Sequence, residues 1–180
     1  MESNLGDIQK NGYQELVVVI ENPQNVIQID SLVENVIRLG ADFVYVVNNP
    51  KALSNNRESS YLGQTQLKTS VPDSKLSSMK KFNSTHECFQ DLSDNEFVSI
   101  ATVLDVDHKD ILHLDEVNYS SIPKLAIWFK DGNEGISEQV YDKCQYIVTI
   151  PTVSFVEVIN IATLISQVLR EVSRQRSDIL

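Results

Sequence analysis

The chain has 180 residues, of which 42% are hydrophobic and 22% charged, and its formal net charge at pH 7 is −10. This composition is ordinary for a soluble globular protein with a sizeable core, so we expect one domain over residues 1–180. The acidic balance argues against broad, sequence-independent binding to nucleic acid, because that affinity comes from cations that neutralise phosphates.

Features of several other protein classes are missing from the sequence. No apolar run approaches the ~18 residues of a membrane helix, and residues 1–4 lack the basic and apolar regions of a signal peptide. Cys88 and Cys144 are too few and too far apart for a disulfide framework. We therefore expect no membrane association, a cytoplasmic location, and two reduced, mostly buried thiols.

The N-terminal part predicts a strand, a helix and a second strand. The apolar run at 16–20 is typical of a central parallel strand. Asn25 and Gln28 are spaced like a capping box, and apolar residues then recur at helical spacing up to Gly40, where a left-handed C-cap belongs. The run at 43–47 is the next strand, which completes a right-handed βαβ unit.

The middle of the chain is less regular. Residues 48–78 are polar and rich in Asn and Ser, and we interpret them as a long excursion that is compatible with a helical piece at 54–62. Ser84 and Glu87 spell a capping box, which predicts a short helix through Leu92. The other expected elements here are strands at 79–82 and 97–104 and an acidic connection at 105–123.

The last third predicts a ligand site. Apolar strands at 125–129 and 146–150 each end in a polar loop, the first of which leads into a short helix from Ile136. Two successive strand ends that open into such loops make a crevice at the carboxyl edge of an α/β sheet. The alternation of strands and helices favours a mostly parallel sheet with helices on both faces.

The final helix, from Ile159 onward, carries apolar residues around most of its circumference. A helix of that kind must be covered on two sides. The sheet covers one side and a partner subunit is expected on the other, so the pattern predicts a homodimer. The apolar positions are Ile159, Ile161, Ala162, Leu164, Ile165, Val168, Leu169 and Val172.

Motifs for several other chemistries are incomplete or absent. The acidic stretch at 105–110, with His113 and Asp115, lacks the glycine and glutamate of a calcium loop and the spacing of zinc ligands. We interpret it as a solvated loop and expect no metal. A Walker loop, a Gly-x-Ser-x-Gly elbow and a Gly-x-Gly-x-x-Gly after the first strand are all missing, so a dinucleotide site is unsupported.

Three motifs in order resemble the SpoU (TrmH-like) family of RNA ribose methyltransferases, in the SPOUT superfamily. Residues 22–25, Asn-Pro-Gln-Asn, resemble the family's opening motif, Asn-Pro-x-Asn-x-Gly. Residues 132–137, Gly-Asn-Glu-Gly-Ile-Ser, resemble its glycine loop, and 150–151 with 159–160 resemble its third motif, Ile-Pro-Met-x-Gly-x-x-x-Ser-Leu-Asn-Val. The likeness covers about residues 16–175.

This resemblance implies a fold, a cofactor and a reaction. Family members fold as an α/β knot, so a deep C-terminal trefoil knot is expected over about residues 125–172, although true knots are rare in proteins. The resemblance further implies S-adenosylmethionine as cofactor, tRNA or rRNA as partner, a homodimer, and methylation of a ribose 2′-hydroxyl.

The resemblance also assigns site residues. The catalytic candidates are Asn25, Glu134 and Asn160. Cofactor-binding candidates lie at strand ends and in the loops, where adenine would find apolar walls and close backbone approach. They are Thr102, Leu104, Gly132, Ile150, Pro151 and Ile159.

The sequence departs from the family pattern where the chemistry is expected. The family's arginine, six residues after the second asparagine of the opening motif, is Ser31 here, preceded by Asp30. Arg38 lies about 10 Å further along the helix by the helical rise and cannot replace it. In the third motif the expected methionine, glycine and serine are Thr152, Ser154 and Val158.

The glycine loop can be aligned in two registers. Matching the letters of 132–135 requires a two-residue deletion before Ile136. Keeping the spacing from Phe129 instead places Lys130 at the family's first glycine and Gly132 at its glutamate. Both registers stay open at the level of sequence.

Two functional hypotheses follow. In the first, the chain is an S-adenosylmethionine-dependent RNA 2′-O-methyltransferase in which Glu134, Asp30 or a group from the other subunit acts in place of the arginine. In the second, it is a catalytically degenerate knotted dimer that serves as an RNA-binding or protein-interaction module. The sequence names neither the RNA nor the nucleotide, but the most basic segment, the expected RNA contact, carries Lys68, Lys75, Lys80 and Lys81.

Overall fold

The structure is a computed structural model, and it describes residues 14–23, 29–48, 78–104, 110–130, 135–150 and 160–177. These residues form a sheet of seven strands in the order β3-β2-β1-β6-β4-β7-β5, and every pairing is parallel. The strands are β1 (Glu15–Glu21), β2 (Phe43–Val47), β3 (Met79–Phe82), β4 (Val98–Val103), β5 (Leu112–His113), β6 (Lys124–Lys130) and β7 (Tyr146–Thr149).

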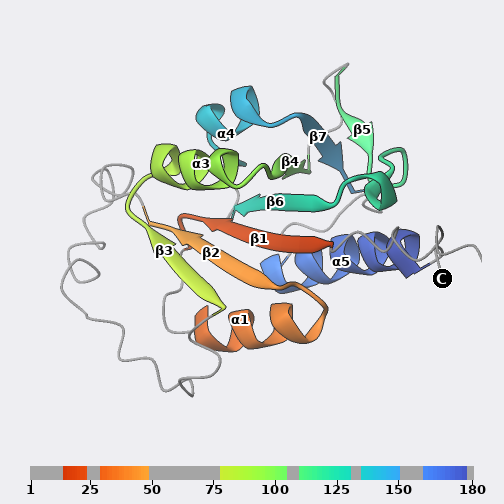
Figure 1. The fold of residues 1–180 in the computed structure, drawn as a ribbon, viewed down its shortest axis with the longest axis horizontal. Helices are drawn as coiled ribbons and strands as arrows, with labels where there is room; N and C mark the ends of the chain where they lie inside the picture. The colour runs from red at the N-terminus through yellow and green to blue at the C-terminus, as the bar shows by residue number, and fades with distance from the viewer. Residues whose placement is uncertain are drawn as a thin grey trace, which may run out of the picture.

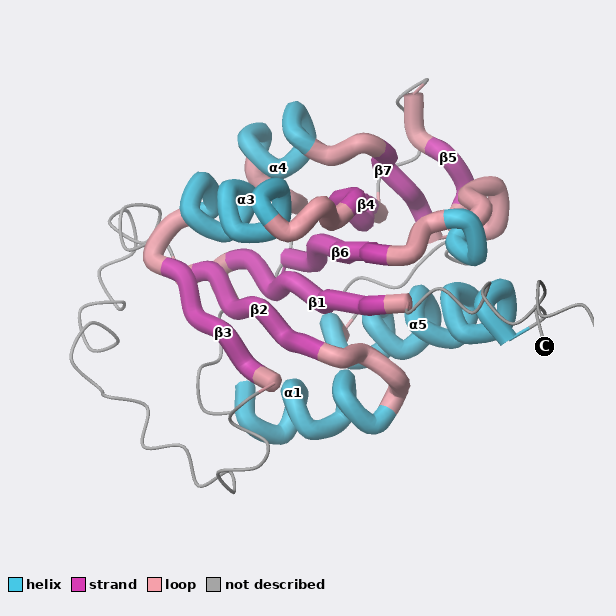
Figure 2. Tube along the Cα trace, viewed as in Figure 1, coloured by secondary structure: helices cyan, strands magenta, loops and turns pink. Residues whose placement is uncertain are grey.

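Helices cover both faces of the sheet, as the alternation of elements predicts (Figures 1 and 2). One face is covered by α1 (Ile29–Arg38) and α5 (Ile161–Ser177), and the other by α3 (Thr85–Asp94) and α4 (Glu138–Lys143). A short 3₁₀ helix, η4 (Tyr119–Ser121), packs beside α5. The predicted α/β class is confirmed.

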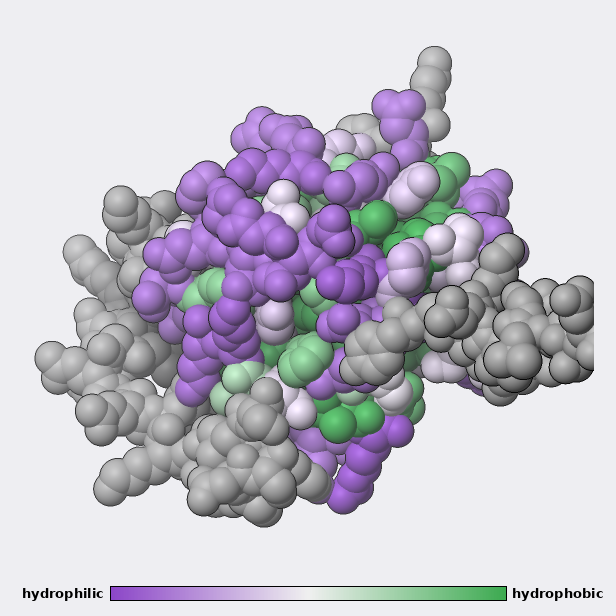
Figure 3. All heavy atoms as spheres, in the orientation of Figure 1, coloured by the Kyte–Doolittle hydropathy of each residue, from purple (hydrophilic) through white to green (hydrophobic). Residues whose placement is uncertain are grey.

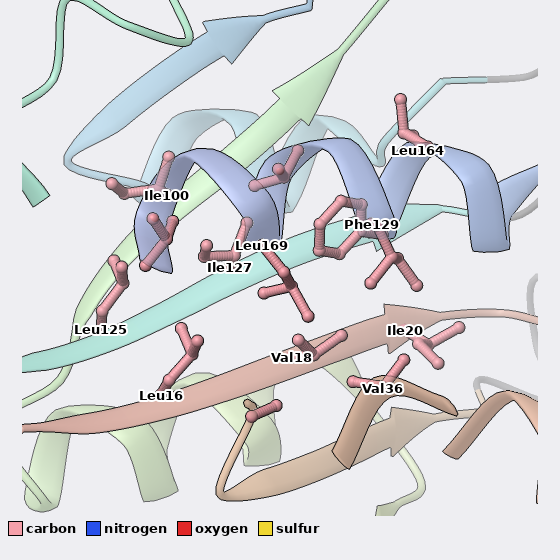
Figure 4. Close-up of a cluster of buried hydrophobic side chains, with 14 of the residues drawn as sticks. Leu16, Val18, Ile20, Val36, Ile100, Leu125, Ile127, Phe129, Leu164 and Leu169 are labelled. Carbon is pink, nitrogen blue, oxygen red and sulfur yellow. The ribbon is translucent and has the colours of Figure 1, made fainter. Parts of the chain in front are cut away.

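The central strands are apolar throughout because both of their faces are buried. On β1, Leu16, Val18 and Ile20 belong to the core beneath α1 and α5, whereas Val17 and Val19 belong to the core beneath α3 and α4. Figure 4 shows the first of these cores, in which side chains of β1 and β6 meet Leu164 and Leu169 of α5. This burial is the main driving force for the fold.

Local signals in the sequence place several element ends correctly. Gly40 has a φ of +103°, the left-handed conformation expected after α1. Ser84 caps α3 by accepting a hydrogen bond from the Glu87 amide at 3.2 Å. The Glu87 carboxylate accepts from the Asn83 amide, one residue before the cap, and α3 continues to Asp94.

The acidic connection expected at 105–123 is more ordered in its second half than the sequence predicted. This half contains β5 and η4 and buries Leu114, Val117 and Tyr119. The two-residue β5 is too short to show a strand period in sequence, so only its pairing with β7 reveals it. Residues 105–109, and the helical piece expected at 54–62, lie outside the described residues.

The interpretation of α5 as apolar around most of its circumference is also wrong. Within the described helix, the fully buried residues lie on one face, toward the sheet. Thr163, Gln167 and Arg170 occupy the outer face and are exposed. The chain's own sheet therefore accounts for the apolar residues of α5, and the helix by itself no longer argues for a dimer.

None of the helices in the described residues has the length and apolar character needed to span a membrane.

Candidate functional site

The three sequence motifs leave the sheet at the same edge. β1, β6, β4 and β7 are neighbours in that order and run parallel, so their carboxyl ends, at Glu21, Lys130, Val103 and Thr149, line one edge. The crevice predicted from the sequence belongs at this edge, where β6 and β7 end. The structure adds that β4 lies between those two strands, so its end at Val103 belongs to the same edge.

The most buried charged side chain in the described residues lies at this edge. Glu21, at the end of β1, is 1% exposed, and its carboxylate accepts three hydrogen bonds. The donors are the Thr85 hydroxyl at 2.9 Å, the Ser137 hydroxyl at 2.6 Å and the Ser137 amide at 3.0 Å. These contacts connect β1 to the start of α3 and to the N-cap of α4.

Sequence analysis missed Glu21. The signal that could have found it is a carboxylate that directly follows the apolar run at 16–20 and directly precedes a turn at Asn22 and Pro23. Asn22 has a φ of 47°, so the chain turns sharply out of the sheet there. A buried charge in such a place requires hydrogen-bond donors, and two helix starts supply them.

Two predicted cofactor residues lie at the end of β4 and differ in exposure. Thr102 is buried, and its hydroxyl donates to the Trp128 carbonyl of β6 at 2.8 Å. That hydroxyl is therefore used within the sheet. Leu104, immediately after the strand, is 46% exposed and presents an apolar surface beside the crevice.

The end of β7 holds one predicted residue and one that sequence analysis missed. Ile150 is 3% exposed and belongs to the core beneath α1 and α5. Thr149, also 3% exposed, has a buried hydroxyl with no hydrogen-bond partner among the described residues. Since buried hydroxyls are normally paired, this atom at the crevice is suited to a polar ligand atom.

Asn160 caps the helix that follows the third motif. Its side-chain oxygen accepts from the Ala162 amide at 2.8 Å, and its carbonyl accepts from the Thr163 and Leu164 amides. Of its polar side-chain atoms, only the amide nitrogen therefore remains available for a reaction. The other candidates lie outside the described residues: Asn25, Gly132, Glu134, Pro151 and Ile159.

The position of the missing family arginine is at the start of α1, which follows the carboxyl end of β1. Ser31 is exposed there, and Asp30 has one buried carboxylate oxygen without a hydrogen-bond partner among the described residues. Arg38 ends the helix and pairs with Glu34 at 2.7 Å. The structure thus agrees that Arg38 does not take the arginine's place.

The two thiols do not supply a nucleophile. Burial, followed by the nearby Asp91 carboxylate, raises the pKa of Cys88, and burial raises that of Cys144. Both cysteines are unpaired, and both thiols stay protonated at neutral pH. Among the described residues no three potential ligands cluster to hold a metal ion.

The basic segment expected to contact RNA is only partly described, since Lys68 and Lys75 lie outside the described residues. Lys80 forms an ion pair with Asp91 of α3 and lies over the Tyr45 and Phe82 rings. Lys81 is exposed on the edge strand β3. The surface over α3 and α4 is largely hydrophilic (Figure 3).

A hollow of about 530 Å³ lies away from this edge, where α3, α4 and the start of β4 meet. Its polar lining includes His86, Gln90, Lys143 and Gln145. Because β4 begins there, the hollow belongs to the amino end of the sheet, and no predicted site residue lines it. The carboxyl edge remains the candidate site.

Comparisons with known proteins agree with this geometry. The sequence profile of the SpoU rRNA Methylase family matches residues 15–166, from the start of β1 into α5. No match was found among curated proteins.

Solved structures share the fold. A TrmH/SpoU tRNA modifying enzyme from A. aeolicus is 17% identical with a TM-score of 0.67, over 93% of this chain and 79% of that one. The methyltransferase AviRb from Streptomyces viridochromogenes, in complex with AdoMet, is 20% identical with a TM-score of 0.66, over 92% of this chain and 62% of that one. A probable methyltransferase from Bordetella pertussis Tohama I is 13% identical with a TM-score of 0.65, over 92% and 98%.

Proposed function

The chain belongs to the SpoU rRNA Methylase family of S-adenosylmethionine-dependent RNA methyltransferases, and we propose that it methylates a ribose 2′-hydroxyl in tRNA or rRNA. The observation that carries this proposal is the extent of the family match. It spans 15–166 and so includes every strand of the sheet, the four strand ends of the crevice and the start of α5.

The residues at the crevice suit an adenosine-containing cofactor. Leu104 supplies exposed apolar surface after β4, Ile150 packs into the core at the end of β7, and the buried Thr149 hydroxyl has no hydrogen-bond partner among the described residues. Apolar walls with a few polar groups are the usual lining of a small-molecule site. The bound cofactor would supply an activated methyl group, and these side chains would bind and orient it.

The reaction forms a carbon–oxygen bond to the ribose, breaks the carbon–sulfur bond of the sulfonium, and releases the hydroxyl proton. Positioning contributes most to such a transfer, and a general base typically adds about 10²–10⁴ in rate. With Ser31 at the arginine position, the proton needs another acceptor. Asp30, at the start of α1, has a buried carboxylate oxygen without a partner in the ranges that the structure describes, and it is the described residue that we propose for this role.

We also propose the remaining features that family membership implies. These are one domain over 1–180, a trefoil knot within 125–172, a homodimer, and RNA contact through the segment that includes Lys80 and Lys81. The two unpaired cysteines agree with a reducing, cytoplasmic location. Support for the knot comes from the shared fold of the solved structures, and a crystallographic chain trace would test it.

Calorimetry with S-adenosylmethionine is the first test, and we expect saturable binding. Tritium transfer from the methyl-labelled cofactor to bulk tRNA and rRNA is the second, with nucleoside analysis to separate ribose from base methylation. Asp30→Asn should lower kcat about 10²-fold or more without changing cofactor affinity. Asp94→Asn, at the exposed end of α3, is the matched control and should change neither.

A second function is favoured by one observation, the serine at the arginine position of an acidic chain. In that case the protein is a non-catalytic module that binds RNA or protein. Absence of cofactor binding at millimolar S-adenosylmethionine would support this function and reject the enzyme. Cofactor binding without transfer to tRNA or rRNA would leave the family assignment standing and reject these substrates.

A further inference from the structure

We propose that Glu21 is a positioning residue that fixes the carboxyl edge of the sheet for S-adenosylmethionine, an inference that rests on the proposed function. Its side chain is 1% exposed and joins β1 to the first residues of α3 and α4. It lies beside the crevice and is not one of the motif residues. Its role is to fix where the chain leaves the end of β6 and where it returns at the start of α4.

Glu21 fixes two points of the chain on either side of the glycine motif. Along the sheet it is paired in register with Lys130, the last residue of β6. Through its side chain it accepts two hydrogen bonds from Ser137, the residue that caps α4. One residue therefore holds both the exit of the chain from β6 and its return at α4.

Thr85 fixes the carboxylate itself. Its hydroxyl donates to the same Glu21 oxygen, Oε1, that accepts from the Ser137 hydroxyl. The second oxygen, Oε2, accepts from the Ser137 amide, so both oxygens are engaged. A buried carboxylate held in this way has a single low-energy orientation, because any rotation would leave a charge without donors.

The choice of residue argues for positioning rather than packing. Val17 and Val19 lie on the same face of β1, and a third valine would continue that apolar core. The strand's other carboxylate, Glu15 at its first position, is partly exposed and pairs with Lys124, whereas the carboxylate at the last position is buried. Directional hydrogen bonds to Ser137 are what a carboxylate provides there and a valine cannot.

The test compares Ser137→Ala with Ser99→Ala in the whole chain. Each substitution removes one serine hydroxyl that forms a single long-range hydrogen bond. The half-buried Ser137 hydroxyl donates to Glu21, and the buried Ser99 hydroxyl accepts from Trp128. Ser99 lies near the start of β4, away from the crevice. We expect both to lower thermal stability, Ser137→Ala by more because its hydroxyl also caps α4, but a severalfold rise in the dissociation constant for S-adenosylmethionine only with Ser137→Ala.

Substitutions of Glu21 extend the test. Glu21→Ala should weaken cofactor binding by tenfold or more, and Glu21→Gln by less, because the Thr85 and Ser137 hydroxyls can turn to accept from the amide. With saturating cofactor, kcat should change little while KM for the cofactor rises. Amide exchange in a peptide over 135–140 should accelerate in both variants.

The outcomes separate the two proposals. If the wild-type chain does not bind S-adenosylmethionine, the proposed function fails, and this inference fails with it even where amide exchange accelerates. If the wild-type chain binds but Ser137→Ala and Ser99→Ala leave its affinity equally unchanged, the inference alone is overturned. Should Glu21→Ala fail to fold, the serine pair and Glu21→Gln still decide.

Discussion

Polar side chains at the two ends of the parallel sheet have different hydrogen-bond partners. At the amino end, side chains bind main chain: Asp42 accepts from the Leu16 amide at 2.8 Å, and Arg176 donates to the Ile122 carbonyl at 2.8 Å. At the carboxyl end, the Glu21 carboxylate binds the starts of two helices, and the Thr149 hydroxyl has no partner within the described part of the chain. The amino end combines these main-chain caps with the polar hollow beside α3 and α4, whereas the carboxyl end carries the buried carboxylate and the candidate site.

This difference indicates which end of the sheet can hold a ligand site without loss of the fold. Caps that satisfy strand amides and carbonyls stabilise the protein and leave nothing for a ligand. A buried hydroxyl without a partner costs stability, and a ligand-binding role would offset that cost at the carboxyl edge. Substitutions at the amino end should therefore change stability alone, and those at the carboxyl end should also change cofactor binding.

Trp128→Ala should have the largest effect, because this side chain lies between the two ends. It is fully buried, stacks on Phe89 with ring centroids 4.2 Å apart, and donates to the Ser99 hydroxyl. We expect a loss of about 3–5 kcal/mol in the free energy of unfolding, measured by denaturant titration. A loss below about 1 kcal/mol would show that the core beneath α3 is loosely packed.

Arg176→Met tests the amino end. The guanidinium donates to the Ile122 carbonyl and, at 3.5 Å, to the Glu15 carbonyl, and burial lowers its pKa. Losing these bonds should cost about 1–2 kcal/mol of unfolding free energy. Affinity for S-adenosylmethionine should stay at the wild-type value, and a weaker affinity would break the distinction between the two ends.

Thr149→Val tests the carboxyl end, where we expect the unfolding free energy to rise rather than fall. Removing a buried hydroxyl that lacks a hydrogen-bond partner among the described residues should raise the unfolding free energy by about 1 kcal/mol. At the same time it should weaken cofactor binding, since under the proposed function this hydroxyl at the end of β7 is available to the cofactor. A drop in stability would instead show that the hydroxyl is already paired in the free protein.

Glu171→Gln should have the smallest effect and depends on pH. A hydrogen bond from Arg174 is the main cause that lowers the Glu171 pKa to about 2 from an ordinary value of 4.5. The folded state therefore holds this proton less tightly than the unfolded state, so the pair stabilises the protein above pH 4.5 and the benefit disappears as pH falls toward 2.

Because the Arg174 side chain is 58% exposed, we expect only about 0.5 kcal/mol at pH 7. The difference in unfolding free energy between wild type and Glu171→Gln should shrink in titrations taken from pH 7 to pH 3. A difference that grows as the pH falls would contradict the assignment. Added salt at pH 7 should reduce it as well.

Local signals in the sequence determined much of this protein. The strands at 43–47 and 79–82, the cap at Ser84 and the left-handed Gly40 follow from apolar runs and capping residues, which act over a few positions. The order of the three motifs likewise placed the candidate site at strand ends. These features can be predicted without knowing which distant residues are in contact.

Only the tertiary structure decided the rest, because it depends on residues far apart in the chain. The pairing of β5 with β7, the single buried face of α5, and the insertion of β4 between β6 and β7 are long-range outcomes. Glu21 is the clearest case, since Ser137 lies 116 positions away from it. A carboxylate at a strand end has no meaning in sequence until the fold brings its hydrogen-bond donors to it.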